Sequence, residues 1–368
     1  MIRVLHVVGA RPNFMKIAPI MRAMTHRGGF EQTLVHTGQH YDDNMSNAFF
    51  EDLELPRPDL NLEVGSGSHA EQTALVMMRI ESIIAQRQPD WVVVPGDVNS
   101  TLAAALTAAK LGVRVAHVEA GLRSFDRSMP EEINRVLTDH IADLLFTTSA
   151  EANDHLRREG VDSAKIRFVG NVMIDTLVAL LPKARARWPE LRHRLGLHGR
   201  FVLVTLHRPS NVDGADRLSE IMSALNEISV AVPVIFPVHP RTRGRLQDGA
   251  ATVAPGVRII EPLGYLDFLA LETRAALVLT DSGGVQEETT YLGIPCLTAR
   301  RNTERPVTLT QGTNRLVASD RRALLEAARE ALEDHDRPHR APPEFWDGRT
   351  AGRIVDTFID IQWKTNEP

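Results

Sequence analysis

The chain has 368 residues, of which 43% are hydrophobic and 24% are charged, a composition typical of a globular protein that buries a substantial core. Its length suits two domains, and its formal net charge of −5 argues against a general binder of nucleic acid or of membrane surfaces. Any bound anion must therefore be held by a local cluster of basic residues. The one cysteine, Cys296, excludes a disulfide scaffold or a cysteine-based metal site within the chain.

The N-terminal segment has only a short apolar run before Gly9 and lacks the cleavage site of a secretion signal. No apolar run approaches the length of a membrane span. We therefore expect a cytoplasmic protein.

Short apolar segments alternate with helix-length segments through the first half of the chain. Strands are expected at residues 3–8, 32–36, 91–95, 113–118, 144–148 and 166–169, with amphipathic helices such as 70–86 and 101–111 between them. This alternation predicts βαβ units and a parallel sheet, in a first domain of residues 1–170.

An Arg-rich, helix-like stretch then interrupts the pattern, and we expect Pro182 and Pro189 to break it. We interpret residues 171–199 as a connector. Strand-like segments resume at residues 201–206, 234–237, 257–260, 276–280 and 295–298, which predicts a second domain of residues 200–349. The fold class is therefore α/β, with two doubly wound domains and a ligand in the cleft between them. Residues 350–363 form a possible amphipathic helix that needs a surface to cover.

The segment 117–135, HVEAGLRSFDRSMPEEINR, follows an apolar strand and is dense in carboxylates and arginines. Open α/β sheets place their active sites beyond the strand ends, so these carboxylates are candidates for proton transfer. Glu119 precedes Ala120-Gly121, where little side-chain bulk shields it. Glu131 and Glu132 follow Pro130 at an expected helix start, where glutamates also have a purely structural use.

A second motif, residues 278–288, places glycines where a strand gives way to a helix. Unshielded backbone N–H groups at Gly283 and Gly284 suit a diphosphate, Ser282 adds a hydroxyl donor, and Glu288 could accept hydrogen bonds from ribose hydroxyls. An ordinary capped turn, with Ser282 as N-cap, fits the segment equally well.

Three polar side chains follow strands of the first domain. Arg11 and Lys16 lie in a strand–turn–helix segment that matches neither GxGxxG nor a Walker loop, so nicotinamide or ATP binding is disfavoured. Taken alone, two solvated basic residues are the better explanation for both. Asp97 follows the strand 91–95, where it could reach a ligand or cap a helix.

Two histidines, His207 and His239, end successive strands of the second domain, each followed within two residues by an arginine. Their matching positions indicate a rim that faces an anion. His36 and His40 flank a turn, and neither HExxH nor a cysteine pair occurs, so no metal site is expected.

Taken together, the motifs resemble those of the non-hydrolysing UDP-N-acetylglucosamine 2-epimerases over nearly the whole chain. They are GARPNFMKIAP, HTGQH, PGDVNST, HVEAGLR, PEEINR, LHRPSN, TDSGG followed by QEE, and TERP. The resemblance implies two Rossmann-like domains of the glycosyltransferase-B type, an active site in the interdomain cleft, UDP held mainly by the second domain, and a final helix 350–368 that returns to the first. It implies no metal and no redox cofactor, and the family is commonly dimeric, so a homodimer is expected.

The implied reaction inverts C2 of UDP-GlcNAc to give UDP-ManNAc, by elimination of UDP to 2-acetamidoglucal and its re-addition. By motif matching the catalytic set is Asp97, Glu119, Glu131 and His207. The substrate-binding set is Arg11, Lys16, His239, Phe268, Ser282, Gly283, Gly284, Glu288 and Arg305.

Four other functions stay open. These are a 2-epimerase of a related sugar such as UDP-2,3-diacetamido-2,3-dideoxyglucuronate, a hydrolysing epimerase that releases ManNAc and UDP, a glycosyltransferase on the same scaffold, and a non-catalytic nucleotide-sugar sensor. The sensor is disfavoured because four candidate acid/base groups are intact.

Overall fold

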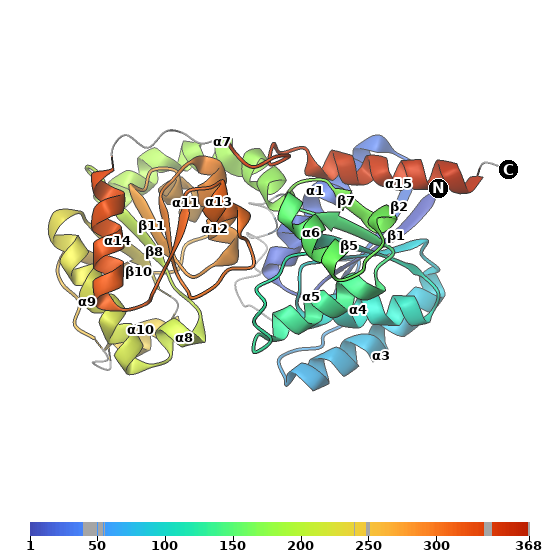
Figure 1. Ribbon diagram of the computed structural model, residues 1–368, viewed down its shortest axis with the longest axis horizontal. Coiled ribbons are helices and arrows are strands. Elements are labelled where there is room, and N and C mark those ends of the chain that lie inside the picture. The colour runs from blue at the N-terminus through green and yellow to red at the C-terminus, as the bar shows by residue number, and fades with distance from the viewer. Residues whose placement is uncertain are drawn as a thin grey trace. The chain divides into compact units, whose positions relative to one another are not determined.

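The computed structural model describes residues 1–39, 50, 54, 56–238, 240–247, 251–334 and 341–366. The chain divides into two compact units: residues 1–179 with 344–368, and residues 180–343. Each unit is a parallel sheet with helices on both faces (Figure 1). None of the helices in the described part of the chain combines the length and apolar character needed to span a bilayer.

The first unit contains a seven-stranded sheet of order β3-β2-β1-β4-β5-β6-β7. Its strands are β1 (Ile2–Val8), β2 (Phe30–His36), β3 (Leu60–Asn61), β4 (Trp91–Pro95), β5 (Arg114–Ala120), β6 (Leu144–Thr147) and β7 (Ile166–Phe168), all paired in parallel. The inner strands are almost continuously buried and apolar, as expected for a sheet covered on both faces. The strand order reverses direction between β1 and β4, and such reversals are where doubly wound sheets bind ligands.

The helices of this unit are α1 (Arg11–Arg27), α3 (His69–Arg87), α4 (Asn99–Lys110), α5 (Pro130–Ile141), α6 (Ala150–Arg158) and α15 (Thr350–Asn366), with a short 3₁₀ turn η1 (Ser163–Lys165). Helices α3, α4 and α5 pack in a row, whereas α15 lies beside α1 (Figure 1). Ser68 caps α3 by accepting from the Glu71 N–H, and Glu71 bonds back to Ser68.

The C-terminal segment is fastened to the first unit along its length. Phe358 of α15 is fully buried, with its ring 5.3 Å from that of Trp91 and 5.6 Å from that of Phe146. The Trp346 indole N–H donates to the Thr148 carbonyl at 2.9 Å. Asp175 accepts from the first backbone N–H groups of α15, which would otherwise lack partners.

The second unit repeats the topology with six strands of order β10-β9-β8-β11-β12-β13. They are β8 (Val202–Thr205), β9 (Val234–Pro237), β10 (Val257–Ile260), β11 (Leu277–Thr280), β12 (Cys296–Ala299) and β13 (Asn314–Val317), again all parallel. Its helices are α8 (Pro209–Val212), α9 (Ala215–Ala231), α10 (Pro240–Gln247), α11 (Tyr265–Glu272), α12 (Gly283–Leu292), α13 (Val307–Thr310) and α14 (Arg321–Glu333). Helices α9 and α14 pack together over one apolar core, and the reversal of strand order falls between β8 and β11.

The stretch expected to be broken by two prolines is instead one continuous helix, α7 (Val172–Arg194), so that expectation is wrong. An interior proline removes a backbone hydrogen bond and costs about 3 kcal/mol. Packing offsets this cost, because Leu180, Ala184 and Leu191 of α7 are buried. The division between the two units falls inside this helix, between residues 179 and 180.

Candidate functional site

Two of the predicted catalytic carboxylates lie at neighbouring strand ends of the first sheet, beside its reversal of strand order. Glu119 is the penultimate residue of β5, and Asp97 follows β4 directly after Pro95-Gly96. Strands β4 and β5 are paired in register up to Pro95 and Val118. The fold therefore brings both carboxylates to the edge where α/β proteins bind ligands.

Glu119 forms a buried ion pair with Lys16 of α1. Both side chains are more than nine-tenths buried. A Cβ built on Gly96 would lie 3.1 Å from the Lys16 ammonium nitrogen and 3.6 Å from Glu119 Oε2, so the pair sits directly against the loop after β4. The structure thus joins a predicted binding residue to a predicted catalytic one across 103 positions of sequence.

The backbone of Glu119 is strained. Its φ of +74° lies in the left-handed region that side chains other than glycine avoid, and the pairing of β5 with β6 shifts register between Val118 and Ala120. Such a conformation costs on the order of 1–3 kcal/mol and is found most often at functional sites.

Asp97 is held by Arg135 of α5, whose guanidinium lies 2.5 Å from its carboxylate. Arg135 also contacts Glu132 at 2.6 Å. Glu132 in turn accepts from the backbone N–H groups of Ser124 and Phe125 and from the Ser124 hydroxyl. Glu132 therefore has the structural use that its place at a helix start suggested, because it fastens the 124–125 turn to α5.

Glu131 and Arg11 are both half-buried. Glu131 lies in the first turn of α5, and within the described residues its carboxylate has no hydrogen-bond or ion-pair partner. Arg11 is the first residue of α1. Both are thus placed near the strand ends that carry Asp97 and Glu119.

A buried network that the sequence analysis did not identify supports this edge of the sheet. His117 Nε2 lies 2.7 Å from the Gly96 carbonyl and Nδ1 lies 2.6 Å from Asp139. Asp139 also accepts from the Gly121 N–H at 3.0 Å and from Arg123 at 2.7 Å. Burial alone would raise the pKa of Asp139, but His117 and Arg123 hold it below its ordinary value. Both ring nitrogens of His117 thus face hydrogen-bond acceptors.

The same network gives Arg123 a structural role. Its guanidinium is buried and also binds Glu159 at 2.8 and 2.6 Å. Arg123 is one of the arginines of the segment 117–135, and its donors are directed at protein carboxylates and at the Leu122 carbonyl. The sequence feature that could have indicated this network is His117 inside an apolar strand, because a buried histidine needs a hydrogen-bond partner.

In the second unit, His207 follows β8 and Asp281 follows β11, on either side of the reversal of strand order. The His207 ring is exposed, and its Nδ1 lies 2.9 Å from the fully buried Asp281 carboxylate. His239, the other predicted histidine, lies outside the described residues. Of the two predicted histidines, the structure thus describes His207, which lies at the edge of the second sheet beside its reversal of strand order.

The glycine motif begins α12, which fits both an anion-binding helix start and an ordinary capped turn. Ser282 is the N-cap residue, but its hydroxyl makes no capping hydrogen bond. A Cβ on Gly283 would lie 2.5 Å from Arg305 Nη1, so only glycine lets the guanidinium approach this backbone. Arg305 is also bound by Glu287, at 2.7 Å, and by Glu304. Arg305, Ser282 and Gly283 are thus gathered at one helix start, with Gly284 next in sequence.

Glu288 lies further along α12 within a buried group of polar side chains. The Tyr265 hydroxyl donates to Glu288 at 2.7 Å. Burial raises the pKa of Glu288 to about 7, and burial together with the neighbouring Glu288 raises that of Glu272 well above its ordinary value. Phe268, also of α11, is half-buried.

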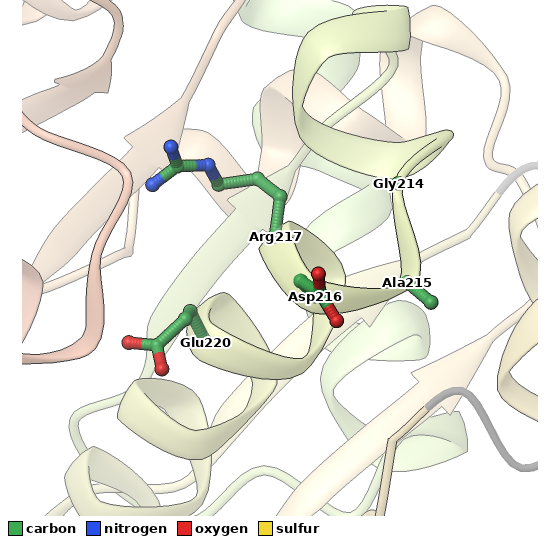
Figure 2. Close-up of a pocket in the computed structure, with 5 residues that line it drawn as sticks. All are labelled: Gly214, Ala215, Asp216, Arg217 and Glu220. Atoms are coloured by element: carbon green, nitrogen blue, oxygen red, sulfur yellow. The ribbon is translucent and has the colours of Figure 1, made fainter.

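One hollow of the second unit lies apart from the candidate site. Figure 2 shows a surface depression at the start of α9, lined by Gly214, Ala215, Asp216, Arg217 and Glu220. None of the predicted site residues lines it, and the Arg217 guanidinium is directed at the Ser319 carbonyl, 2.9 Å away. Among the described residues, no group of three or more His, Cys, Asp or Glu side chains is arranged to hold a metal ion.

Comparison with known proteins connects this arrangement to an enzyme family. Residues 22–359 match the sequence model of the family described as UDP-N-acetylglucosamine 2-epimerase. The UDP-N-acetylglucosamine 2-epimerase of Methanocaldococcus jannaschii is 44% identical over 358 residues, covering 95% of this chain and 96% of that protein. The UDP-2,3-diacetamido-2,3-dideoxy-D-glucuronate 2-epimerase of Pseudomonas aeruginosa is 46% identical over 335 residues, covering 90% and 92%.

A solved structure supports the fold as well as the family. The M. jannaschii UDP-GlcNAc 2-epimerase in complex with UDP-GlcNAc and UDP superposes with a TM-score of 0.88 at 43% identity, covering 98% of this chain and 100% of that one. The two Rossmann-like domains of the glycosyltransferase-B type that the motifs implied are thereby confirmed. The chain belongs to the UDP-N-acetylglucosamine 2-epimerase family and is an epimerase, a member of the isomerases.

Proposed function

We propose that the protein interconverts UDP-GlcNAc and UDP-ManNAc by inverting C2, through elimination of UDP to 2-acetamidoglucal and re-addition of UDP. The observation that carries this proposal is the pair of candidate carboxylates, Asp97 and Glu119, at adjacent strand ends, each in contact with a cationic side chain. Family membership and the UDP-GlcNAc complex of the M. jannaschii relative support it.

The proposed chemistry explains why carboxylates and cations occur together. The C2 proton is not acidic, because no carbonyl group is conjugated to that carbon. A base takes this proton while the C1–O bond breaks, the C1=C2 double bond forms, and UDP leaves with the bonding electron pair. In the return step an acid delivers a proton to the opposite face of C2 and a UDP oxygen re-forms the bond to C1. Negative charge develops on the diphosphate as it leaves, so cationic and N–H donors must be ready to receive it.

We assign the proton-transfer steps to Asp97, Glu119, Glu131 and His207. The first three belong to one edge of the first sheet, and His207 belongs to the corresponding edge of the second. Two groups are needed because the proton leaves one face of C2 and returns to the other.

We assign the nucleotide mainly to the second unit. The N–H groups at Gly283 and Gly284, the Ser282 hydroxyl and the Arg305 guanidinium would hold the diphosphate, and Glu288 the ribose hydroxyls. Lys16, Arg11, His239 and Phe268 remain proposed substrate contacts. No metal or redox cofactor enters the proposed reaction, and the homodimer and the cytoplasmic location remain predictions.

A second candidate substrate is UDP-2,3-diacetamido-2,3-dideoxyglucuronate. The observation that favours it is the P. aeruginosa 2-epimerase named for that sugar, which is 46% identical. Both substrates need the same C2 chemistry, so the substrate must be decided by a panel that measures kcat/KM for each UDP-sugar.

The test of the proposed reaction is incubation with UDP-GlcNAc in D2O, followed by NMR at C2. We expect UDP-ManNAc to appear with deuterium at C2; absence of both would overturn the proposal for this substrate. Free ManNAc as the product would instead establish a hydrolysing epimerase.

Variants identify the residues that carry the reaction. Asp97→Asn, Glu119→Gln and Glu131→Gln should each abolish exchange while UDP binding, measured by calorimetry, persists. Asp126→Asn is the matched control, because Asp126 contacts Ser128 in the loop before α5 and has no assigned role in proton transfer. Full exchange in any of the three variants removes that residue from the mechanism.

A further inference from the structure

We propose that Asp281 is the positioning residue for His207: it orients the imidazole and fixes which ring nitrogen carries the proton. The inference rests on the proposed function, since it concerns a group assigned to proton transfer there. Asp281 follows β11 and His207 follows β8, two adjacent parallel strands whose pairing extends to Thr205 and Thr280. The pairing of the two strands therefore sets how the two side chains approach each other.

The Asp281 carboxylate is completely buried and fully engaged. Besides His207 Nδ1 at 2.9 Å, it accepts from the backbone N–H of His207 at 3.1 and 3.2 Å and from that of Arg208 at 3.0 Å. It also accepts from Asn211 Nδ2 at 3.0 Å, and the same amide group donates to the Ala299 carbonyl at the end of β12. This carboxylate is thus immobile, as is required of a group that orients another.

The partners also decide the protonation of Asp281. Every contact other than the imidazole comes from an N–H donor, which favours the ionised carboxylate. Burial alone would raise the pKa of Asp281, but the hydrogen bonds from His207, Asn211 and the Arg208 backbone hold it below its ordinary value. An ionised carboxylate only accepts hydrogen bonds, so His207 Nδ1 must carry a hydrogen.

The arrangement leaves Nε2 as the nitrogen that can exchange a proton. The His207 side chain is 58% exposed, although its partner Asp281 is fully buried. A neutral ring with its proton on Nδ1 accepts at Nε2, and one further proton makes Nε2 a donor. A carboxylate that fixes the tautomer of a histidine in this way raises reactivity without touching the substrate.

A purely structural role predicts different behaviour. Because Asp281 also accepts from the backbone of the 207–208 loop, it could serve only to anchor that loop. The Asp281→Asn variant separates the two roles. Its amide keeps the size of the side chain and retains an oxygen for the backbone N–H groups, but it no longer obliges Nδ1 to carry the proton.

The first measurement is the ¹⁵N NMR signature of the His207 ring in the full-length protein at neutral pH, assigned with His207→Asn. We expect the Nδ1–H form in the wild-type protein and a shift toward Nε2–H in Asp281→Asn. An Nε2–H ring in the wild-type protein overturns the proposal, and this outcome needs neither the Asp281→Asn variant nor turnover of any UDP-sugar. It therefore decides the inference even where the proposed reaction fails.

The second measurement is a double-mutant cycle on kcat with UDP-GlcNAc. Asp281→Asn should lower kcat about 10–100-fold with little change in KM, as is usual for residues that orient a reactive group. In a His207→Asn background the same substitution should have no further effect, because its influence passes through the imidazole. If the two substitutions lower kcat multiplicatively, Asp281 acts only as an anchor for the 207–208 loop. If His207→Asn keeps full activity, neither residue takes part in catalysis, although the epimerisation itself still occurs.

Discussion

Replacement of Glu272 by glutamine is expected to stabilise the protein by an amount that grows as the pH rises. Glu272 is completely buried, and both burial and the charge of Glu288 raise its pKa well above the ordinary value of 4.5. Glu288 is itself buried, with a pKa raised to about 7 chiefly by burial and further by Glu287. The folded protein therefore keeps protons at these positions that the unfolded chain releases.

The magnitude follows from the proton count. When the folded state binds one proton more than the unfolded state, the free energy of unfolding falls by about 1.4 kcal/mol for each unit of rising pH. This applies to Glu272 from its unfolded pKa of 4.5 up to its raised folded pKa. Between the unfolded pKa of 4.5 and its raised folded pKa, Glu272 should thus remove stability as the pH rises, by about 1.4 kcal/mol for each pH unit, and Glu272→Gln should restore it. Below the unfolded pKa both proteins should be alike in this respect.

The assay is urea denaturation of the wild-type protein and of the variant at pH 5.5, 6.5 and 7.5. Glu333→Gln is the matched control, because Glu333 is an exposed glutamate of α14 in the same unit. Its stability should run parallel to that of the wild-type protein across the pH range. If Glu272→Gln also runs parallel to the wild-type protein, the buried carboxyl group does not retain its proton and the reasoning is refuted.

Three further predictions concern stability and reactivity. Gly121→Ala should lower the free energy of unfolding by at least about 2 kcal/mol, because φ is +78° and the added Cβ would lie 2.5 Å from a backbone oxygen. Gly112 is the matched control: its φ is +72° but it faces open space, so Gly112→Ala should lower the free energy of unfolding by only about 1–2 kcal/mol. Burial raises the pKa of Cys296 to about 12, so a thiol reagent at pH 8 should react far faster in urea than with the folded protein, and equal rates would contradict the burial. Lys16→Met and Glu119→Gln should each lower the free energy of unfolding by about 3–5 kcal/mol, because each removes one partner of a buried ion pair. The double variant should lose much less than the sum of the two, and strict additivity in denaturation would show that the pair is not coupled.

Most of the fold could be predicted from the sequence because the inner strands appear there as apolar segments of ordinary strand length. Segments such as 91–95 and 113–118 are apolar and separated by amphipathic helices, which is the pattern of a covered parallel sheet. Two edge strands were not predicted. Leu60–Asn61 is too short to show any periodicity, and Asn314–Val317 begins with a buried asparagine and an exposed arginine, which obscure an apolar strand pattern. Their pairing depends on the neighbouring strand rather than on their own composition.

The candidate site could be predicted as a set of residues but not as a set of contacts. The motifs named Lys16, Glu119, Asp97 and His207, yet the ion pair that joins the first two spans 103 positions, and no local pattern specifies it. Asp281 was not among the candidate residues, because a carboxylate at that position fits an N-cap or a turn as well as a buried partner. Its role depends on which strand lies beside β11, and that is a property of the sheet order.

Glu119 is a position where the local preference of the residue and the fold disagree. A left-handed φ of +74° suits glycine, yet the chain has a glutamate there and places the glycine two residues later. The strain would be needless if only the backbone turn mattered, so the side chain itself must be what the position requires. Glu119→Gly and Glu119→Ala both remove the carboxylate and its contact with Lys16, and they differ only by a Cβ at a left-handed residue. Glu119→Gly should therefore be about 1 kcal/mol more stable than Glu119→Ala in urea denaturation, with both inactive in C2 exchange. Equal stability of the two variants would show that the backbone at Glu119 carries no strain, and exchange in either would show that the strain is not carried for the sake of the carboxylate.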